Sequence, residues 1–92
     1  MKNIVLITGG GKRLGSLIAK ELSKESFHIV LHYNKSEKQA LETKDEIIKN
    51  GGKVDLIRKE ITSENDAMDL IGESINFLED DENQQFTLIN NA

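Results

Sequence analysis

The chain has 92 residues, of which 37% are hydrophobic and 30% are charged, a composition typical of one soluble globular domain or a piece of one. Twelve Lys and Arg residues against sixteen Asp and Glu residues give a net charge of −4, which argues against a general nucleic-acid partner. The absence of Cys excludes disulfides, thiolate zinc sites and Cys nucleophiles. Purely apolar runs reach only four residues, so we expect no membrane span, no signal peptide and a cytoplasmic location.

The first part of the chain predicts a strand, a helix and a second strand. Residues 2–8 are rich in Ile and Val and end at a run of glycines, a pattern typical of a strand buried on both faces. Apolar residues then recur with the spacing of one helical face, at Leu14, Leu17, Ile18 and Leu22. Residues 27–33 form the second predicted strand, with His28 expected at the surface where this strand begins.

The middle of the chain predicts a second helix with a defined start and end. Ser36 and Gln39 have the spacing of a capping box, in which a hydroxyl and an amide satisfy free backbone donors. The sequence Asn50-Gly51-Gly52 is expected to end this helix in the left-handed conformation. The predicted apolar face of the helix consists of Ala40, Leu41, Ile47 and Ile48.

The remaining residues repeat the pattern. Residues 53–58 predict a third strand, and Thr62 or Ser63 can cap a third helix. The apolar face predicted for this helix, with Met68 in the core, consists of Met68, Ile71, Ile75 and Leu78. Residues 86–89 predict a fourth strand.

Strands that alternate with helices over short connections predict right-handed crossovers and a parallel sheet with helices on both faces. We expect the spatial strand order 3-2-1-4, which is the first half of a Rossmann-type, doubly wound α/β fold. Residues 1–92 then form the N-terminal part of a dinucleotide-binding domain.

The glycine-rich turn at residues 8–15 lies between a predicted buried strand and a helix. Glycines there let the backbone approach a pyrophosphate, and the helix N-terminus offers free N–H groups. The strict motif G-x-G-x-x-G is broken by Leu14, and the P-loop is broken because Ser16-Leu17 stands where Lys-Ser/Thr is needed. A tight turn without any ligand is the alternative interpretation.

The end of the second strand bears on the choice of nucleotide. NAD-preferring folds usually place a carboxylate about 20 residues past the glycines, but residues 27–36 contain no acid. Four other residues close this stretch: Tyr33, Asn34, Lys35 and Ser36. An amide, a cation and a hydroxyl suit the 2′-phosphate of NADP, and Lys12 and Arg13 are expected to face the same opening. Alternatively, Lys35 is a solvated loop lysine and Ser36 only a helix cap.

These motifs resemble the short-chain dehydrogenase/reductase family, and the resemblance extends over all 92 residues. Thr8-Gly9 and Gly15 match its opening turn Thr-Gly-x-x-x-Gly-x-Gly, with Arg13 in place of the middle Gly. Residues 12–15 and 32–36 are similar to the NADP-dependent pteridine reductase branch.

Two further segments carry the same resemblance. Glu60-Ile61-Thr62 stands where the family often has Asp-Val/Leu-Thr, with the acid on the adenine amino group. Residues 88–92 match the ending of the family's fourth strand, Asn-Asn-Ala, which normally continues into Gly. The cofactor-binding residues implied by the motifs and the resemblance are Gly9, Lys12, Arg13, Leu14, Gly15, Tyr33, Asn34, Lys35, Ser36, Glu60, Ile61, Asn90 and Ala92.

The resemblance implies hydride transfer from NADPH to a carbonyl or pteridine substrate in an intact protein. The family's catalytic Asn, Ser and Tyr-x-x-x-Lys residues come after the fourth strand, and the only tyrosine here, Tyr33, is followed four residues on by Glu37. We therefore expect no catalytic residue in this chain and interpret it as an N-terminal fragment of an NADP-dependent reductase. A non-catalytic nucleotide-binding module and an inactive truncated remnant are the alternatives.

Metal binding and assembly are less defined by the sequence. The two histidines lack grouped carboxylates, and Glu79–Glu82 lacks the alternation and the Gly of a calcium loop, so no metal site is expected. The oligomeric state stays open, with a homo-oligomer among the outcomes.

Overall fold

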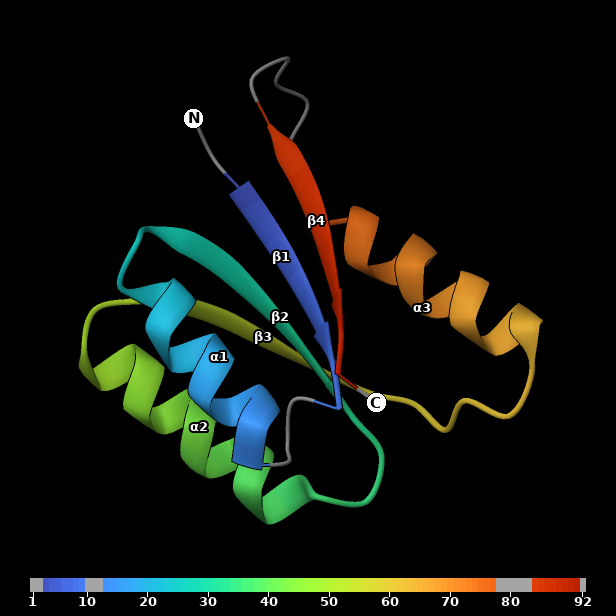
Figure 1. Ribbon diagram of the computed structural model, residues 1–92, viewed down its shortest axis with the longest axis horizontal. Helices are drawn as coiled ribbons and strands as arrows, with labels where there is room; N and C mark the ends of the chain where they lie inside the picture. The colour runs from blue at the N-terminus through green and yellow to red at the C-terminus, as the bar shows by residue number, and fades with distance from the viewer. Residues whose placement is uncertain (1–2, 10–12, 78–83, 92) are drawn as a thin grey trace.

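The computed structural model describes residues 3–9, 13–77 and 84–91, and within them it confirms the expected α/β fold. A parallel sheet has the strand order β3-β2-β1-β4 (Figure 1). Its strands are β1 (Asn3–Thr8), β2 (Phe27–Tyr33), β3 (Lys53–Arg58) and β4 (Gln85–Asn90). The helices are α1 (Arg13–Ser23), α2 (Glu37–Lys49) and α3 (Glu64–Ile75).

Different helices cover the two faces of the sheet (Figure 1). One core cluster joins alternate residues of β1 and β2, such as Val5 and Leu31, to Ala19 of α1 and Ile47 of α2. On the other face, Ile4, Leu6 and Val30 pack against Leu70 of α3. The two central strands are buried on both faces, which explains why their apolar runs are continuous instead of alternating.

The buried stripe of each helix differs from the predicted apolar face. On α1 the buried residues are Gly15 and Ala19, while Leu14 and Leu17 are 59% and 54% exposed. Small side chains bring the helix close to the sheet, so larger apolar residues beside them stay outside the contact. On α2, likewise, Leu41 and Ile48 are exposed, whereas Ala40 and Ile47 are buried.

The prediction that Met68 lies in the core is wrong, because its side chain is 64% exposed. The contact ridge of α3 runs instead through Leu70 and Ser74, which are four residues apart and fully buried. Ile75 is also exposed, and Leu78 lies outside the described residues. Ile71, also predicted for this face, does pack against the core, so the apolar spacing identified the helix and part of the side that it presents to the sheet.

A buried polar contact joins the two helices that share one face. Thr43 of α2 donates its hydroxyl to the Gln39 carbonyl at 2.8 Å, which leaves its oxygen to accept from Ser16 of α1 at 2.6 Å. Nearby, Lys20 and Glu46 form an ion pair at 3.0 Å. A pattern of apolar residues alone does not reveal such a contact.

The two ends of α2 behave differently from each other. Ser36 makes no side-chain capping bond, so the predicted capping box is wrong. Its φ of −88° and ψ of 49° depart from the extended backbone that turns a capping hydroxyl toward the helix. The predicted left-handed end is confirmed, since Gly51 has φ +85° and the N–H of Gly52 reaches the Ile47 carbonyl at 2.9 Å.

The prediction that His28 lies at the surface is also wrong. Its side chain is 11% exposed, and Nε2 lies 2.6 Å from the Asp55 carboxylate. Because His28 is paired with Lys53 in the β2–β3 register, Asp55 is its diagonal neighbour on the same face of the sheet. The edge of the ring packs against Phe77, with the ring centroids 5.7 Å apart.

Candidate cofactor site at the carboxyl ends of the strands

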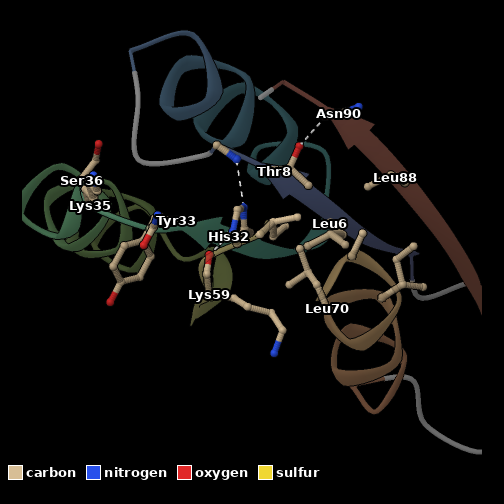
Figure 2. A pocket seen from close by; sticks show the side chains of 15 residues that line it. Leu6, Thr8, His32, Tyr33, Lys35, Ser36, Lys59, Leu70, Leu88 and Asn90 are labelled. Atoms are coloured by element: carbon tan, nitrogen blue, oxygen red, sulfur yellow. Dashed lines mark hydrogen bonds between the residues drawn. The ribbon is translucent and has the colours of Figure 1, made fainter. Parts of the chain in front are cut away.

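A cavity of about 580 Å³ opens at the carboxyl ends of the strands, on the α3 side of the sheet. Thr8, His32 and Asn90 line it from β1, β2 and β4, and Leu70 lines it from α3 (Figure 2). The strand order reverses between β1 and β4, and doubly wound sheets bind ligands at such a point. The fold therefore places the cavity where a ligand is expected.

The structure brings seven of the sequence-predicted residues to this cavity. These are Gly9, Tyr33, Asn34, Lys35, Ser36, Ile61 and Asn90. Arg13, Leu14 and Gly15 begin α1 and do not line the cavity, and Glu60 is an exposed residue beside it. Lys12 and Ala92 lie outside the described residues, as does the acidic segment 79–82.

The start of the glycine turn is held on both sides. Gly9 has φ +63°, a conformation that favours glycine. Its N–H donates to Nδ1 of His32 at 3.2 Å, and its carbonyl accepts from Nδ2 of Asn91 at 3.4 Å. Gly9 is thus connected to the end of β2 and to the residue that follows β4.

Thr8 connects the ends of the two strands on either side of the reversal point. Its hydroxyl donates to Oδ1 of Asn90 at 3.0 Å and accepts from the backbone N–H of Asn91 at 3.0 Å (Figure 2). Thr8 is 8% exposed, so these bonds are shielded from water. They join residues more than 80 positions apart and fix the relative position of β1 and β4.

The loop between β2 and α2 forms a polar wall of the cavity. Lys35 and Ser36 lie together on the side opposite Thr8 and Asn90 (Figure 2). The loop backbone is held from β3, since Nε of Arg58 donates to the Asn34 carbonyl at 3.1 Å. A residue of β3 therefore positions the loop that the sequence assigned to a phosphate.

The charge of the cavity is positive. Its charged lining residues, among those the structure describes, are Lys35 and Lys59, and no Asp or Glu lines it with them. The Nζ of Lys59 lies 3.5 Å from the Glu73 carboxylate, which is a long ion pair. A cavity with cationic groups on one wall and an apolar wall formed by Ile61, Leu70 and Ile71 suits an anionic ligand that also carries an aromatic base.

The set of cofactor-binding residues predicted from the sequence leaves out several contributors, among them His32, Arg58, Lys59 and Asn91. One sequence signal could have indicated His32: side chains alternate along a strand, so His32 lies on the same face of the sheet as Val30. Arg58 and Asn91 act through contacts with Asn34 and Gly9 that no local pattern reveals.

The described residues lack two further kinds of feature. They contain no group of three or more His, Cys, Asp or Glu that could hold a metal ion. Among their helices, none has the length and apolar character needed to cross a membrane.

Comparison with known proteins identifies the family. The family model described as short chain dehydrogenase matches residues 3–92. The chain belongs to the short-chain dehydrogenase/reductase family. It is 32% identical over 76 residues to the short-chain dehydrogenase/reductase homolog YusS of Bacillus subtilis, which covers 83% of this chain and 70% of that protein. It is 38% identical over 72 residues to the hydroxynaphthalene reductase-like protein Arp2 of Metarhizium anisopliae.

The match to Arp2 covers 78% of this chain and 27% of the relative, so the chain spans about a quarter of that protein. A dehydrogenase/reductase from Sinorhizobium meliloti superposes with a TM-score of 0.84 at 27% identity over 98% of this chain and 34% of that one. A putative dehydrogenase from Burkholderia cenocepacia with bound NADP superposes with a TM-score of 0.75 at 29% identity. The match covers 82% of this chain and 29% of that one. FolM from Brucella canis, complexed with NADP, shares the fold at 23% identity, with a TM-score of 0.69 over 79% and 29%.

Proposed function

We propose that this chain binds NADP(H) and forms the nucleotide-binding portion of a reductase in the short-chain family. The observation that carries the proposal is the cavity at the strand-order reversal, whose described charged lining is cationic only. The Burkholderia cenocepacia protein, 29% identical, has NADP bound, which supports the choice of nucleotide. An NAD-specific site would instead place a carboxylate near the ribose hydroxyls.

The cavity divides into parts that suit the parts of the nucleotide. The wall formed by Ile61, Leu70 and Ile71 packs against the adenine, with Glu60 near its amino group. Asn34, Lys35 and Ser36 close around the 2′-phosphate. Because Ser36 makes no capping bond, its hydroxyl is not committed to the helix and can donate to a phosphate oxygen.

The pyrophosphate is assigned to the glycine turn and the start of α1. Gly9 and Gly15 belong to this turn, and Lys12, Arg13 and Leu14 belong to the same segment. The N-terminus of α1 supplies free N–H groups and the positive end of the helix dipole. Asn90 approaches the nucleotide from the end of β4, and Ala92 is assigned to the same site from the sequence alone.

The bound cofactor would supply hydride. In an intact protein, we assign the acceptor of that hydride to the class of carbonyl or pteridine substrates. Residues 12–15 and 32–36 favour the pteridine reductase branch. Tyr33 reaches the cavity but is 8% exposed and belongs to the core cluster beside α1 and α2. Glu37, and not a lysine, stands four residues after it, so Tyr33 does not form the family's Tyr-x-x-x-Lys pair. The proposed role of this chain is therefore to bind and orient NADP(H).

A titration of NADPH and NADH, followed by nucleotide fluorescence or calorimetry, tests the proposal. The wild-type chain should prefer NADPH, and Lys35→Ala should weaken NADPH binding about ten- to a hundredfold while leaving NADH nearly unchanged. Lys49→Ala is the matched control, because Lys49 is an exposed lysine at the other end of α2. Equal affinity for the two cofactors in the wild type would contradict the NADP assignment.

A non-catalytic nucleotide-binding module is the second candidate. It is favoured by the Bacillus subtilis relative, which is itself short, since 76 matched residues make up 70% of it. Neither candidate predicts oxidation of NADPH by the purified 92-residue chain, because the family's catalytic residues are absent from it. The candidates differ in the coding sequence that follows residue 92, where a continuing reading frame with Tyr-x-x-x-Lys would support the reductase and contradict the non-catalytic module.

A further inference from the structure

His32 is a buried residue of the cavity whose two ring nitrogens are both hydrogen-bonded. The residue is 6% exposed and lies at the end of β2. Nδ1 is 3.2 Å from the backbone nitrogen of Gly9, and Nε2 is 2.9 Å from the carbonyl oxygen of Lys59 (Figure 2). One side chain therefore connects the end of β2 to the residues that follow β1 and β3.

The two partners determine which ring nitrogen carries the proton. A carbonyl oxygen only accepts, so Nε2 must donate its hydrogen to Lys59. A backbone N–H only donates, so Nδ1 must present a lone pair to Gly9. The ring is thus the neutral tautomer with hydrogen on Nε2, and the network satisfies both of its polar atoms.

Each bond controls a different part of the cavity. Gly9 opens the glycine turn in a left-handed conformation, and the bond to His32 is the contact that holds its N–H. Lys59 also donates its own N–H to the Tyr33 carbonyl at 2.9 Å, so its backbone is fixed at both polar groups. Lys59 leads toward Ile61 on the apolar wall.

We infer that His32 is a positioning residue of the cofactor site, which holds the backbone of Gly9 in place for the phosphates of the dinucleotide. The inference rests on the proposed function. It does not concern the 2′-phosphate, because the proposed function assigns Gly9 to the pyrophosphate that NADPH and NADH share. Loss of the Gly9 contact should therefore weaken both cofactors, unlike the loss of Lys35.

Two variants separate the two bonds. In His32→Asn the amide oxygen lies near the position of Nδ1 and can still accept from Gly9. In His32→Gln the amide nitrogen lies near the position of Nε2 and can still donate to Lys59. We expect His32→Gln to weaken NADPH and NADH equally, about five- to tenfold, and His32→Asn to bind both within about twofold of the wild type.

His28→Gln is the matched control, because His28 lies four residues earlier on the same strand and outside the cavity. It should leave both affinities unchanged. Equal losses in His32→Asn and His32→Gln would overturn the inference, because a general packing role does not distinguish the two nitrogens. A loss confined to NADPH would overturn it as well.

Failure of the proposed function gives a different result, in which the wild-type chain binds neither cofactor. The tautomer is tested independently by the ¹⁵N chemical shifts of the His32 ring in the free protein. We expect a ring that is protonated on Nε2. We also expect the same ring signals in His28→Gln and Lys35→Ala, because neither substitution removes the contact between His32 and Gly9. A proton on Nδ1 would overturn the inference whether or not the cofactor binds.

Discussion

Arg58 shows how a single side chain outside the predicted set shapes the cofactor cavity. Its Nε donates to the Asn34 carbonyl, which fixes the loop that carries Lys35 and Ser36. A loop that is already held in its bound conformation loses less conformational entropy when the ligand binds. Arg58 therefore raises the affinity for the nucleotide indirectly, by ordering the loop between β2 and α2.

Arg58→Met keeps most of the apolar stem but removes the donor. We expect it to weaken NADPH binding about three- to tenfold, since one hydrogen bond contributes about 0.5–1.5 kcal/mol. NADH should be affected less, because it makes no contact through a 2′-phosphate. Lys53→Met, at the other end of β3, is the control, and equal losses in the two variants would contradict this role.

Asp66 stabilises the backbone at the start of α3. Its carboxylate accepts from the backbone N–H and from the hydroxyl of Thr62, both at 3.0 Å. These bonds, the backbone one first, hold the pKa of the Asp66 carboxyl below its ordinary value. Its contribution to stability is therefore present above the ordinary pKa of about 3.9 and is lost as the pH falls through the lowered folded pKa.

Asp66→Asn should accordingly lower the urea midpoint at pH 7, and should lower it less at about pH 2, where a larger fraction of the wild-type carboxyl is protonated. Asp69→Asn provides the comparison, since Asp69 is an exposed acid on the same helix. Unfolding followed by circular dichroism at the two pH values measures the difference. A shift of the same size at both would show that the ionised form of Asp66 is not responsible.

At the scale of elements, the packing of helices depends on small residues at close contacts. The turn after α2 passes close to the end of α1 at Gly52, where an added Cβ would lie 2.7 Å from Cγ2 of Ile47 and 3.2 Å from Cβ of Ser23. Such a short contact forces neighbouring atoms to move. Gly52 is therefore needed because there is no space for a larger residue.

Gly52→Ala should destabilise the chain by about 1–3 kcal/mol, the range expected for overpacking. Gly72→Ala is a natural contrast, because Gly72 lies within α3 and an added Cβ meets nothing within 4 Å. That substitution should stabilise the chain by about 0.5–1 kcal/mol, because alanine loses less backbone entropy in a helix. Chemical denaturation measures both, and a stable Gly52→Ala variant would contradict the close contact.

At the scale of the whole molecule, β4 is the most exposed part of the described sheet. It pairs with β1 on one side (Figure 1). Thr87 and Leu88 are exposed on its surface. A strand with unpaired backbone groups and apolar side chains is a template for pairing with another chain. Exposed Met68 and Ile75 on α3 add apolar surface to the same molecule.

The purified 92-residue chain should therefore self-associate at micromolar concentration. Thr87→Lys, which places a charge on the exposed edge outside the cavity, should shift it toward the monomer. Gln39→Lys, on the exposed surface of α2, makes the same change of net charge away from β4 and is the control. Light scattering after size exclusion gives the mass, and a monodisperse wild-type monomer would contradict the prediction.

The sequence by itself determined the order and type of the elements, because hydrophobic runs and glycine positions are local properties of the chain. Strand order followed from the handedness of short crossovers, and the location of the cavity followed from the strand order. The strands predicted at 27–33 and 53–58 coincide with β2 and β3.

Only the tertiary structure decided which side of each helix is buried and how the glycine turn is held. Met68 has the right spacing for a core residue, but the position of α3 against the sheet buries Leu70 instead. His32 reaches Gly9 across 23 positions of the chain. Such contacts depend on distances between remote residues, and these distances exist only once the sheet has assembled.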